Sequence, residues 1–145
     1  MFKKILFPTD FSDVSEKAVQ YIKQLKGAGA QEVIVLHVID EKDLLVLSRV
    51  PEQYPRITAL MEEEIAKEMA AVEADMTAVG FHVKLKVKTG KPFREIMMTA
   101  AEEKVSIIVI GSHGKSNIKE MLMGSVSENV IRHAGVPLLV VSREI

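Results

Sequence analysis

The sequence predicts an α/β fold, a single doubly wound domain over residues 1–145 with a five-stranded parallel sheet and helices on both faces. Three observations predict it. Short apolar runs of strand length alternate along the chain with longer stretches of helical periodicity. Most of the short runs are almost wholly apolar, as is typical of parallel strands that are buried on both faces. The length of 145 residues suits one domain.

The composition excludes several classes of partner. A net charge of −1 and a pI near 6.4 give no electrostatic case for a nucleic-acid partner. The chain has no cysteine, so it has neither a disulfide framework nor thiolate chemistry. The first apolar run is too short for a signal peptide, and no run approaches the length of about 20 residues that a membrane span needs. We therefore expect a cytoplasmic protein without membrane contact.

The first predicted strand is Lys3–Pro8, an apolar run that ends in proline. A polar turn follows, in which Ser12 or Asp13 can cap a helix, with Glu16 completing a capping box if Asp13 is the cap. Gly27, two residues before a further glycine, ends that helix.

The second strand is Glu32–Ile39, which is rich in β-branched residues. The segment Asp40–Pro55 reads as a long connection with at most one helical turn, although it contains the apolar patch Leu44–Leu47. From Arg56 to Val79 apolar residues recur at intervals of three and four, which predicts a long helix with a charged, solvated outer face.

The third strand, His82–Lys88, alternates apolar residues with lysines, which predicts an edge strand with one exposed face. Gly90–Pro92 then opens a helix with proline in its first turn. The apolar run Val105–Ile110 predicts the fourth strand, Val126–His133 predicts a helix, and Pro137–Ser142 predicts the last strand.

The segment between the fourth strand and the helix that follows is rich in glycine. Gly111, Gly114 and Gly124 allow the backbone to approach a ligand closely, since no Cβ intervenes. Ser125 is expected to be the N-cap of the helix, and a helix N-terminus suits a phosphate. The loop is not a Walker A motif, because Val109 stands where that motif requires its first glycine.

Ligands of doubly wound sheets bind at the carboxyl ends of strands, where the strand order reverses. If the first and fourth strands are neighbours, Asp10 and Gly111 line one cleft. Asp10 can then accept a hydrogen bond from a ligand hydroxyl, or it can simply cap the first helix. Both alternatives are compatible with its position.

These residues resemble a known family. Pro8–Ser12 (PTDFS), Leu36–Ile39 (LHVI) and the pattern Gly-x2-Gly-x9-Gly-Ser that ends at Ser125 are similar to the universal stress proteins, and more narrowly to their ATP-binding branch. The segment Gly90–Pro92 is also similar to a family pattern. The resemblance extends over essentially the whole chain, and the glycine pattern is its most specific part.

The resemblance implies a strand order of 3-2-1-4-5 and a homodimer that often forms through the last strands, here Pro137–Ser142. It also implies ATP, or AMP or ADP, as ligand, with magnesium or manganese on the phosphates, and for that ion we can name no protein ligand set. The implied contact residues are Pro8, Thr9 and Asp10 for the adenosine half, the backbone of Val38 for the adenine, and Gly111, Ser112, His113, Gly114, Lys115, Gly124, Ser125, Val126 and Ser127 for the ribose and phosphates.

Two functions remain open at this point. The first is a nucleotide-dependent regulatory module that acts on an unknown protein partner. The second is a slow or partner-dependent ATPase or phosphotransferase, for which Lys115 and His113 are the nearby candidates. We assign no catalytic residue, because His113 has no evident carboxylate to orient it, and His37 is interpreted as a core histidine. The four histidines lack metal-ligand spacing, so we assign no metal site.

Overall fold

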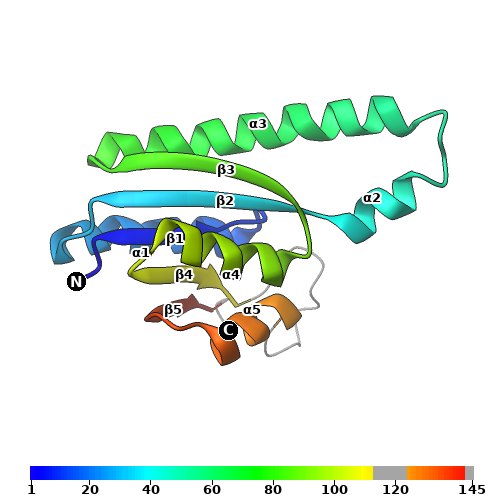
Figure 1. Ribbon diagram of the computed structural model, residues 1–145. Helices are drawn as coiled ribbons and strands as arrows, with labels where there is room; N and C mark the ends of the chain where they lie inside the picture. The colour runs from blue at the N-terminus through cyan, green and yellow to red at the C-terminus, as the bar shows by residue number, and fades with distance from the viewer. Residues whose placement is uncertain (113–123, 143–145) are drawn as a thin grey trace.

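The computed structural model describes residues 1–112 and 124–142. It confirms the predicted fold class: a five-stranded sheet in the order β3-β2-β1-β4-β5, with every neighbouring pair parallel (Figure 1). The elements, in chain order, are β1 (Lys4–Pro8), α1 (Asp13–Leu25), the 3-10 helix η1 (Lys26–Ala28), β2 (Glu32–Asp40), α2 (Glu41–Leu47), α3 (Tyr54–Val79), β3 (His82–Gly90), α4 (Pro92–Glu103), β4 (Ile107–Gly111), α5 (Ser125–His133) and β5 (Leu138–Val141).

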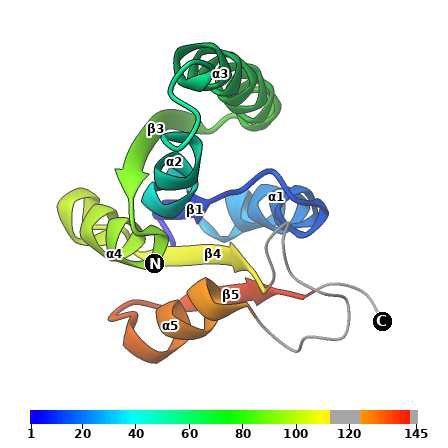
Figure 2. The ribbon, with the colours of Figure 1, turned by 90° about the vertical axis from the view of Figure 1, so that its right-hand side faces the viewer.

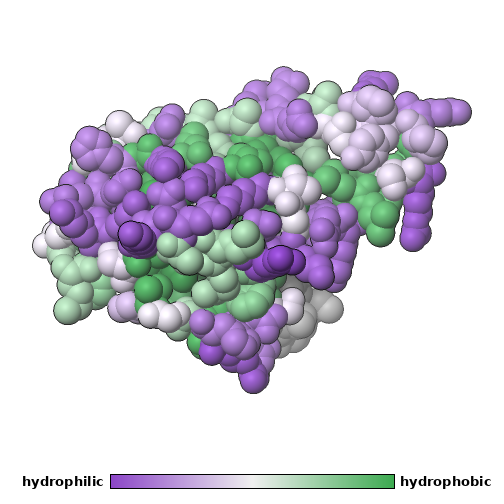
Figure 3. All heavy atoms as spheres, in the orientation of Figure 1, coloured by the Kyte–Doolittle hydropathy of each residue, from purple (hydrophilic) through white to green (hydrophobic). Residues whose placement is uncertain are grey.

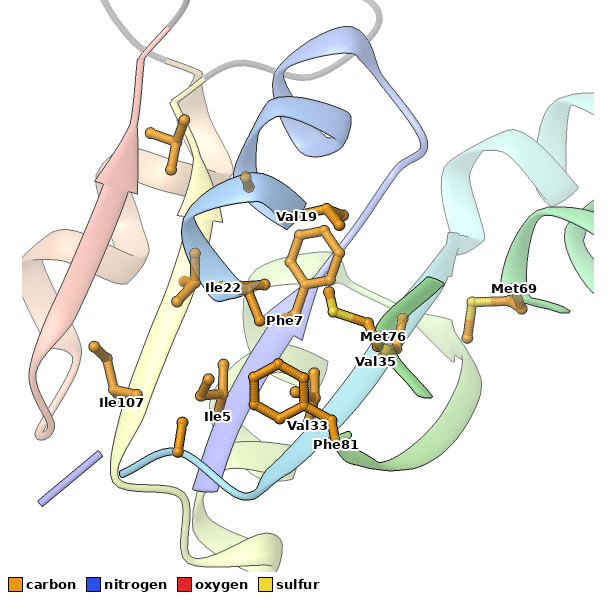
Figure 4. Packing of buried hydrophobic residues seen from close by; sticks show 14 of the residues in the cluster. Ile5, Phe7, Val19, Ile22, Val33, Val35, Met69, Met76, Phe81 and Ile107 are labelled. Atoms are coloured by element: carbon orange, nitrogen blue, oxygen red, sulfur yellow. The ribbon is translucent and has the colours of Figure 1, made fainter. Parts of the chain in front are cut away.

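Helices cover both faces of the sheet. Figure 2, a view onto the carboxyl ends of the strands, places α1 and α3 on one side and α4 and α5 on the other. Successive residues of β2 therefore enter different cores: Val33 and Val35 pack with α1 and α3, and Ile34 packs with α4 and α5. Figure 4 shows the first core, where Phe7 and Met76 lie close to Val35. Burial on both faces explains why these strands read as continuous apolar runs.

The structure identifies the N-caps of α1 and α5. One was expected as an alternative, and the other differs from the expected residue. Ser12 caps α1, its Oγ accepting from the N–H of Ser15 at 3.3 Å, so a capping box from Asp13 does not form. The expectation that Ser125 caps α5 is wrong. Gly124 is the N-cap, with φ −76° and ψ 155°, and its carbonyl accepts the first helical bond from Glu128 at 3.0 Å.

The connection after β2 is more helical than expected. Instead of at most one turn it contains α2, which Asp40 caps by accepting from the N–H of Lys42 at 3.0 Å. The long helix α3 begins at Tyr54, ahead of the expected Arg56. Helix α2 and the first turns of α3 project past the carboxyl ends of the strands (Figure 1). The run Leu44–Leu47 concealed α2 because four consecutive apolar residues show no helical period.

Strand β3 lies at a sheet edge, as predicted, and its lysines form ion pairs with carboxylates of α4, although the Lys84 side chain stays 53% exposed. Lys84 and Lys86 reach Glu103 of α4 at 2.8 and 2.7 Å. Lys88 reaches Glu102 at 3.2 Å. Figure 3 shows a band of hydrophilic surface along β3 on this side of the molecule. The alternating pattern identified the two faces, but it could not reveal that carboxylates of a helix would cover the polar one.

Within the described ranges, no helix is both long enough and apolar enough to cross a lipid bilayer.

Candidate functional site

A cavity of about 640 Å³ opens at the carboxyl ends of the strands. It lies where β1 and β4 are neighbours, so it coincides with the reversal of strand order. The topology thereby brings Asp10 and Gly111 to one cavity, although a hundred residues separate them in the chain. Nine of the expected contact residues line it: Pro8, Thr9, Asp10, Val38, Gly111, Gly124, Ser125, Val126 and Ser127.

Of the other four expected residues, only Ser112 belongs to the described part of the chain, and it is not among the residues that line the cavity. Ser112 is buried beside it, where its N–H donates to the carbonyl of Val141 and its carbonyl accepts from Gly124, both at 2.8 Å. It therefore connects the sheet to the start of α5. His113, Gly114 and Lys115 lie outside the described residues.

Local hydrogen bonds stabilise the turn Thr9–Ser12 that follows β1. Thr9 Oγ1 accepts from the N–H of Phe11 at 3.0 Å. Asp10 Oδ1 accepts from the N–H of Ser12 at 3.0 Å and from Ser15 Oγ at 3.2 Å. Asp10 therefore helps to begin α1 and lines the cavity at the same time, so the two alternatives for this residue do not exclude each other. Its carboxylate can accept about four hydrogen bonds.

His37 lies at the cavity, and its interpretation as a core histidine is corrected. Its side chain is half-buried, and Nδ1 lies 2.8 Å from the carbonyl oxygen of Thr9. Because a carbonyl can only accept, Nδ1 carries the proton of this bond, and Nε2 of the neutral ring is an acceptor. The ring also stacks on Phe11, with centroids 4.6 Å apart.

The opposite end of the cavity is built from β4 and α5. Ser127 Oγ donates to the carbonyl of Gly111 at 2.6 Å, which fixes the first turn of α5 against the end of β4. The first N–H groups of an α-helix have no acceptor within the helix, and here they belong to residues 125–127 of the cavity wall. A partial positive charge accompanies them, so this end suits an anion.

Gly111 has a packing role that the sequence did not reveal. A Cβ at this position would lie 2.7 Å from Cγ1 of Val14 in α1, which is closer than non-bonded carbon atoms approach. The absence of a side chain therefore allows α1 to pack on the end of β4. The sequence indicated only that this glycine allows the close approach of a ligand.

Much of the cavity wall was not predicted. It comes from the end of β2, from α2 and from α3, and its residues include Asp40, Asp43, Met61, Glu64, Ile65 and Glu68. The spacing of the four α3 residues was a usable signal, because positions i, i+3, i+4 and i+7 share one helix face. The sequence pattern alone places Met61 and Ile65 in a buried apolar stripe and Glu64 and Glu68 on a solvated charged face. Nothing local indicated that this face extends beyond the sheet.

Charge is distributed unevenly around the cavity. Five carboxylates line it, from Asp10, Asp40, Asp43, Glu64 and Glu68, whereas no lysine or arginine of the described ranges does. No three His, Asp or Glu side chains in these ranges are grouped as a metal ion would require. The described residues therefore supply no protein ligand set for a divalent ion.

The chain is similar in sequence to one family of known proteins over nearly its whole length. The model of the universal stress protein family matches residues 1–142. Universal stress protein MJ0577 of Methanocaldococcus jannaschii is 42% identical over 157 residues, covering 99% of this chain and 97% of the relative. Universal stress protein YxiE of Bacillus subtilis is 33% identical over 147 residues, covering 97% and 99%.

Solved structures agree with the fold. The structure of MJ0577 has a TM-score of 0.91 and 44% identity, covering 99% of this chain and 98% of the other. A universal stress protein in complex with cAMP has a TM-score of 0.68 and 24% identity, covering 97% of each chain. The universal stress protein from Archaeoglobus fulgidus in complex with dAMP has a TM-score of 0.64 and 19% identity, covering 97% and 99%. At these low identities, the last two show the shared fold alone.

Proposed function

The chain belongs to the universal stress protein family, and from this we propose that it is an ATP-binding module that regulates a partner protein according to the nucleotide it holds. The observation that carries the proposal is the cavity at the strand-order reversal, lined by Gly111, Gly124 and the N-terminus of α5. AMP and ADP fit the same description, because all three nucleotides share the adenosine and the first phosphate.

The charge distribution around the cavity supports one orientation of the proposed nucleotide. The phosphates lie at the N-terminus of α5, where helical N–H groups and the helix dipole favour anions. At the other end, like charges about 6 Å apart would repel by roughly 3 kcal/mol each at an effective dielectric constant of about 20. The adenosine therefore lies toward Asp10 and Val38, with a ribose hydroxyl donating to the Asp10 carboxylate. The backbone of Val38 contacts the adenine.

The remaining contacts are also proposals. Ser125, Val126 and Ser127 donate backbone N–H groups to phosphate, and Ser112, His113, Gly114 and Lys115 complete the phosphate side. A magnesium or manganese ion accompanies the phosphates and is held by them and by water. The related proteins solved with cAMP and dAMP support an adenine nucleotide as the class of ligand.

The regulatory role is favoured over an enzyme by what lines the described part of the cavity. Phosphoryl transfer needs positive groups that clamp the phosphates and a base that positions the nucleophile. The described lining contains no lysine or arginine, so Lys115 alone is proposed as a positive side chain at the phosphates, and His37 Nδ1 is bonded to a backbone carbonyl. Any hydrolysis is therefore slow, or requires a partner that completes the site.

We also propose a cytoplasmic homodimer that forms through Pro137–Ser142. Strand β5 ends the sheet, and Leu138, Leu139 and Val140 are only half-buried in one chain. Such an edge has unpaired backbone groups beside apolar side chains, which favours pairing with a second copy.

Extraction of the nucleotide from freshly purified protein tests the proposed function. The protein is denatured, and the released compounds are identified by chromatography and mass spectrometry. Mostly ATP in near-stoichiometric amount supports the regulatory module, whereas mostly ADP favours the enzyme. Protein that carries no nucleotide and does not bind added ATP with magnesium contradicts both.

A further inference from the structure

The cavity extends past the end of the sheet onto the α1/α3 side. Alternation along β2 directs Val38 toward the α4/α5 core, whereas Ile39 packs with the α1/α3 core. On the α1/α3 side, the residues that line the cavity have no role in the proposed nucleotide contacts. We call this part the acid-rimmed lobe and define it by the floor Phe11, His37, Ile39, Met61 and Ile65 and the rim Asp43, Glu64 and Glu68.

The floor of the acid-rimmed lobe is mostly apolar and is continuous with the α1/α3 core. Ile65 is 8% exposed, and Phe11, Ile39 and Met61 pack against the same core as β1 and β2. The stacked pair of Phe11 and His37 adds an aromatic surface. A surface of this kind binds an apolar or aromatic group, and an aromatic ring also attracts a cation over its face.

The rim supplies negative charge that the described part of the chain does not neutralise. No lysine, arginine or histidine of that part lies within 4.0 Å of a carboxylate oxygen of Asp43, Glu64 or Glu68. The contrast with Glu103 is clear, because three lysines surround that residue. The rim is therefore complementary to a positive charge.

These features select one class of occupant. An anion would be repelled by three carboxylates, and a neutral apolar molecule would gain no attraction from the rim charges. A metal ion would need at least three converging ligands, which the described side chains do not provide. We propose that the acid-rimmed lobe is a second binding site, beside the nucleotide, for a small organic cation with an apolar or aromatic body.

The proposal rests on the cavity itself and does not require that the neighbouring part holds a nucleotide. If both ligands bind, the cation lies in the same cavity as the negative phosphates. Each ligand then raises the affinity of the other by the same factor. The lobe would let the protein respond to an organic amine as well as to a nucleotide.

The test compares benzamidinium with benzamide, which has nearly the same shape and no charge. Binding to the full chain without nucleotide is measured by calorimetry, and the site is located by NMR shifts of the Met61 methyl and the His37 ring. We expect benzamidinium to bind at least about tenfold more tightly than benzamide, with an affinity that falls as salt is added.

Variants separate the rim from charge in general. Glu64→Gln combined with Glu68→Gln should weaken benzamidinium binding by about tenfold. The control combines Glu62→Gln with Glu63→Gln, which removes the same charge from exposed positions of α3 outside the cavity lining and should change little. Glu64→Gln alone, at an exposed position, serves if the double variant folds poorly.

Three results would overturn the proposal: equal affinity for benzamide and benzamidinium, equal effects of the two double variants, or shifts confined to residues outside the acid-rimmed lobe. The nucleotide is measured separately on the same samples. If the protein binds benzamidinium but never binds ATP, the proposed function is contradicted, and the proposal of a cation site in the acid-rimmed lobe still stands.

Discussion

The ring of His37 stacks on the ring of Phe11, with centroids 4.6 Å apart and ring planes inclined by 24°. Phe11 has φ +63°, a left-handed conformation that costs a bulky residue roughly 1–3 kcal/mol. The stack and the bond from His37 Nδ1 to the Thr9 carbonyl both attach the turn to β2. Since Asp10 lies between Thr9 and Phe11, β2 determines where its carboxylate stands.

The first prediction follows from this arrangement. His37→Leu removes the stack and the hydrogen bond, so it should lower the affinity for ATP by about fivefold to tenfold and destabilise the fold by about 1 kcal/mol. His37→Asn should recover part of the loss, because the Asn amide can donate to the Thr9 carbonyl. Calorimetry and urea unfolding measure both quantities. If His37→Leu binds ATP as tightly as the parent protein, His37 does not position the turn.

The second prediction concerns Gly111 and Val14. Gly111→Ala introduces a Cβ 2.7 Å from Val14 Cγ1, so it should destabilise the fold by about 1–3 kcal/mol. Val14→Ala should cost stability alone but should be less harmful when combined with Gly111→Ala, because it makes room for the added carbon. A double-mutant cycle by urea unfolding measures this coupling. Strict additivity would show that the two residues do not interfere.

The third prediction separates binding from folding at Gly124. This buried residue has φ −76° and ψ 155°, which any residue can adopt, so a side chain causes no backbone strain here. Gly124→Val should therefore abolish nucleotide binding and leave the fold intact, because the side chain fills the entrance to the α5 N-terminus. The same outcome is expected for a bulky residue at Gly114. Circular dichroism and ATP titration check it, and full affinity in Gly124→Val would contradict the proposed site.

The fourth prediction is a pH dependence at Glu103. Its hydrogen bonds with Lys84 and then Lys86 hold the pKa of this carboxyl down to about 2. A lowered pKa stabilises the fold fully above about pH 4.5, the ordinary value, and the stabilisation is lost as the pH falls toward about 2. With screening by solvent, we expect on the order of 1–2 kcal/mol at neutral pH.

Glu103→Gln tests this contribution by urea unfolding as a function of pH. The variant should be less stable than the parent protein at pH 7, and the difference should vanish as the pH approaches about 2. Glu102→Gln is the matched control, because its side chain is 50% exposed and its ion pair should contribute little. Stability curves of Glu103→Gln and the parent protein that stay parallel through the acid range would refute the assignment.

The fifth prediction tests the proposed dimer at β5. The N–H of Ser112 donates to the Val141 carbonyl at 2.8 Å, which directs that residue's backbone toward β4. The peptide groups of the preceding residue, Val140, therefore point to the open edge. Val140→Pro should remove an outward N–H without disturbing the β4 pairing, and should convert a dimer to a monomer in light scattering. Val87→Lys, on the opposite edge strand, should leave the dimer intact.

Local patterns predicted the elements well because each element must bury one face or both. The run Glu32–Ile39 is apolar on both sides, and β2 indeed has a core on each side. The recurrence of apolar residues at intervals of three and four from Arg56 to Val79 predicted α3, apart from its first residues. The glycines near Gly111 and the resemblance of the segment after Pro8 pointed to one cleft, and the sheet order brings these segments together.

The sequence by itself determined the alternation of strands and helices, since the period of its apolar residues reports which faces are buried. Only the tertiary structure decided which polar faces meet. Lysines of β3 form ion pairs with Glu103 of α4, whereas Glu64 and Glu68 lie on the part of α3 that lines the cavity. The physical reason is that electrostatic contacts and cavities depend on distances between elements far apart in the chain. A local sequence pattern does not determine those distances.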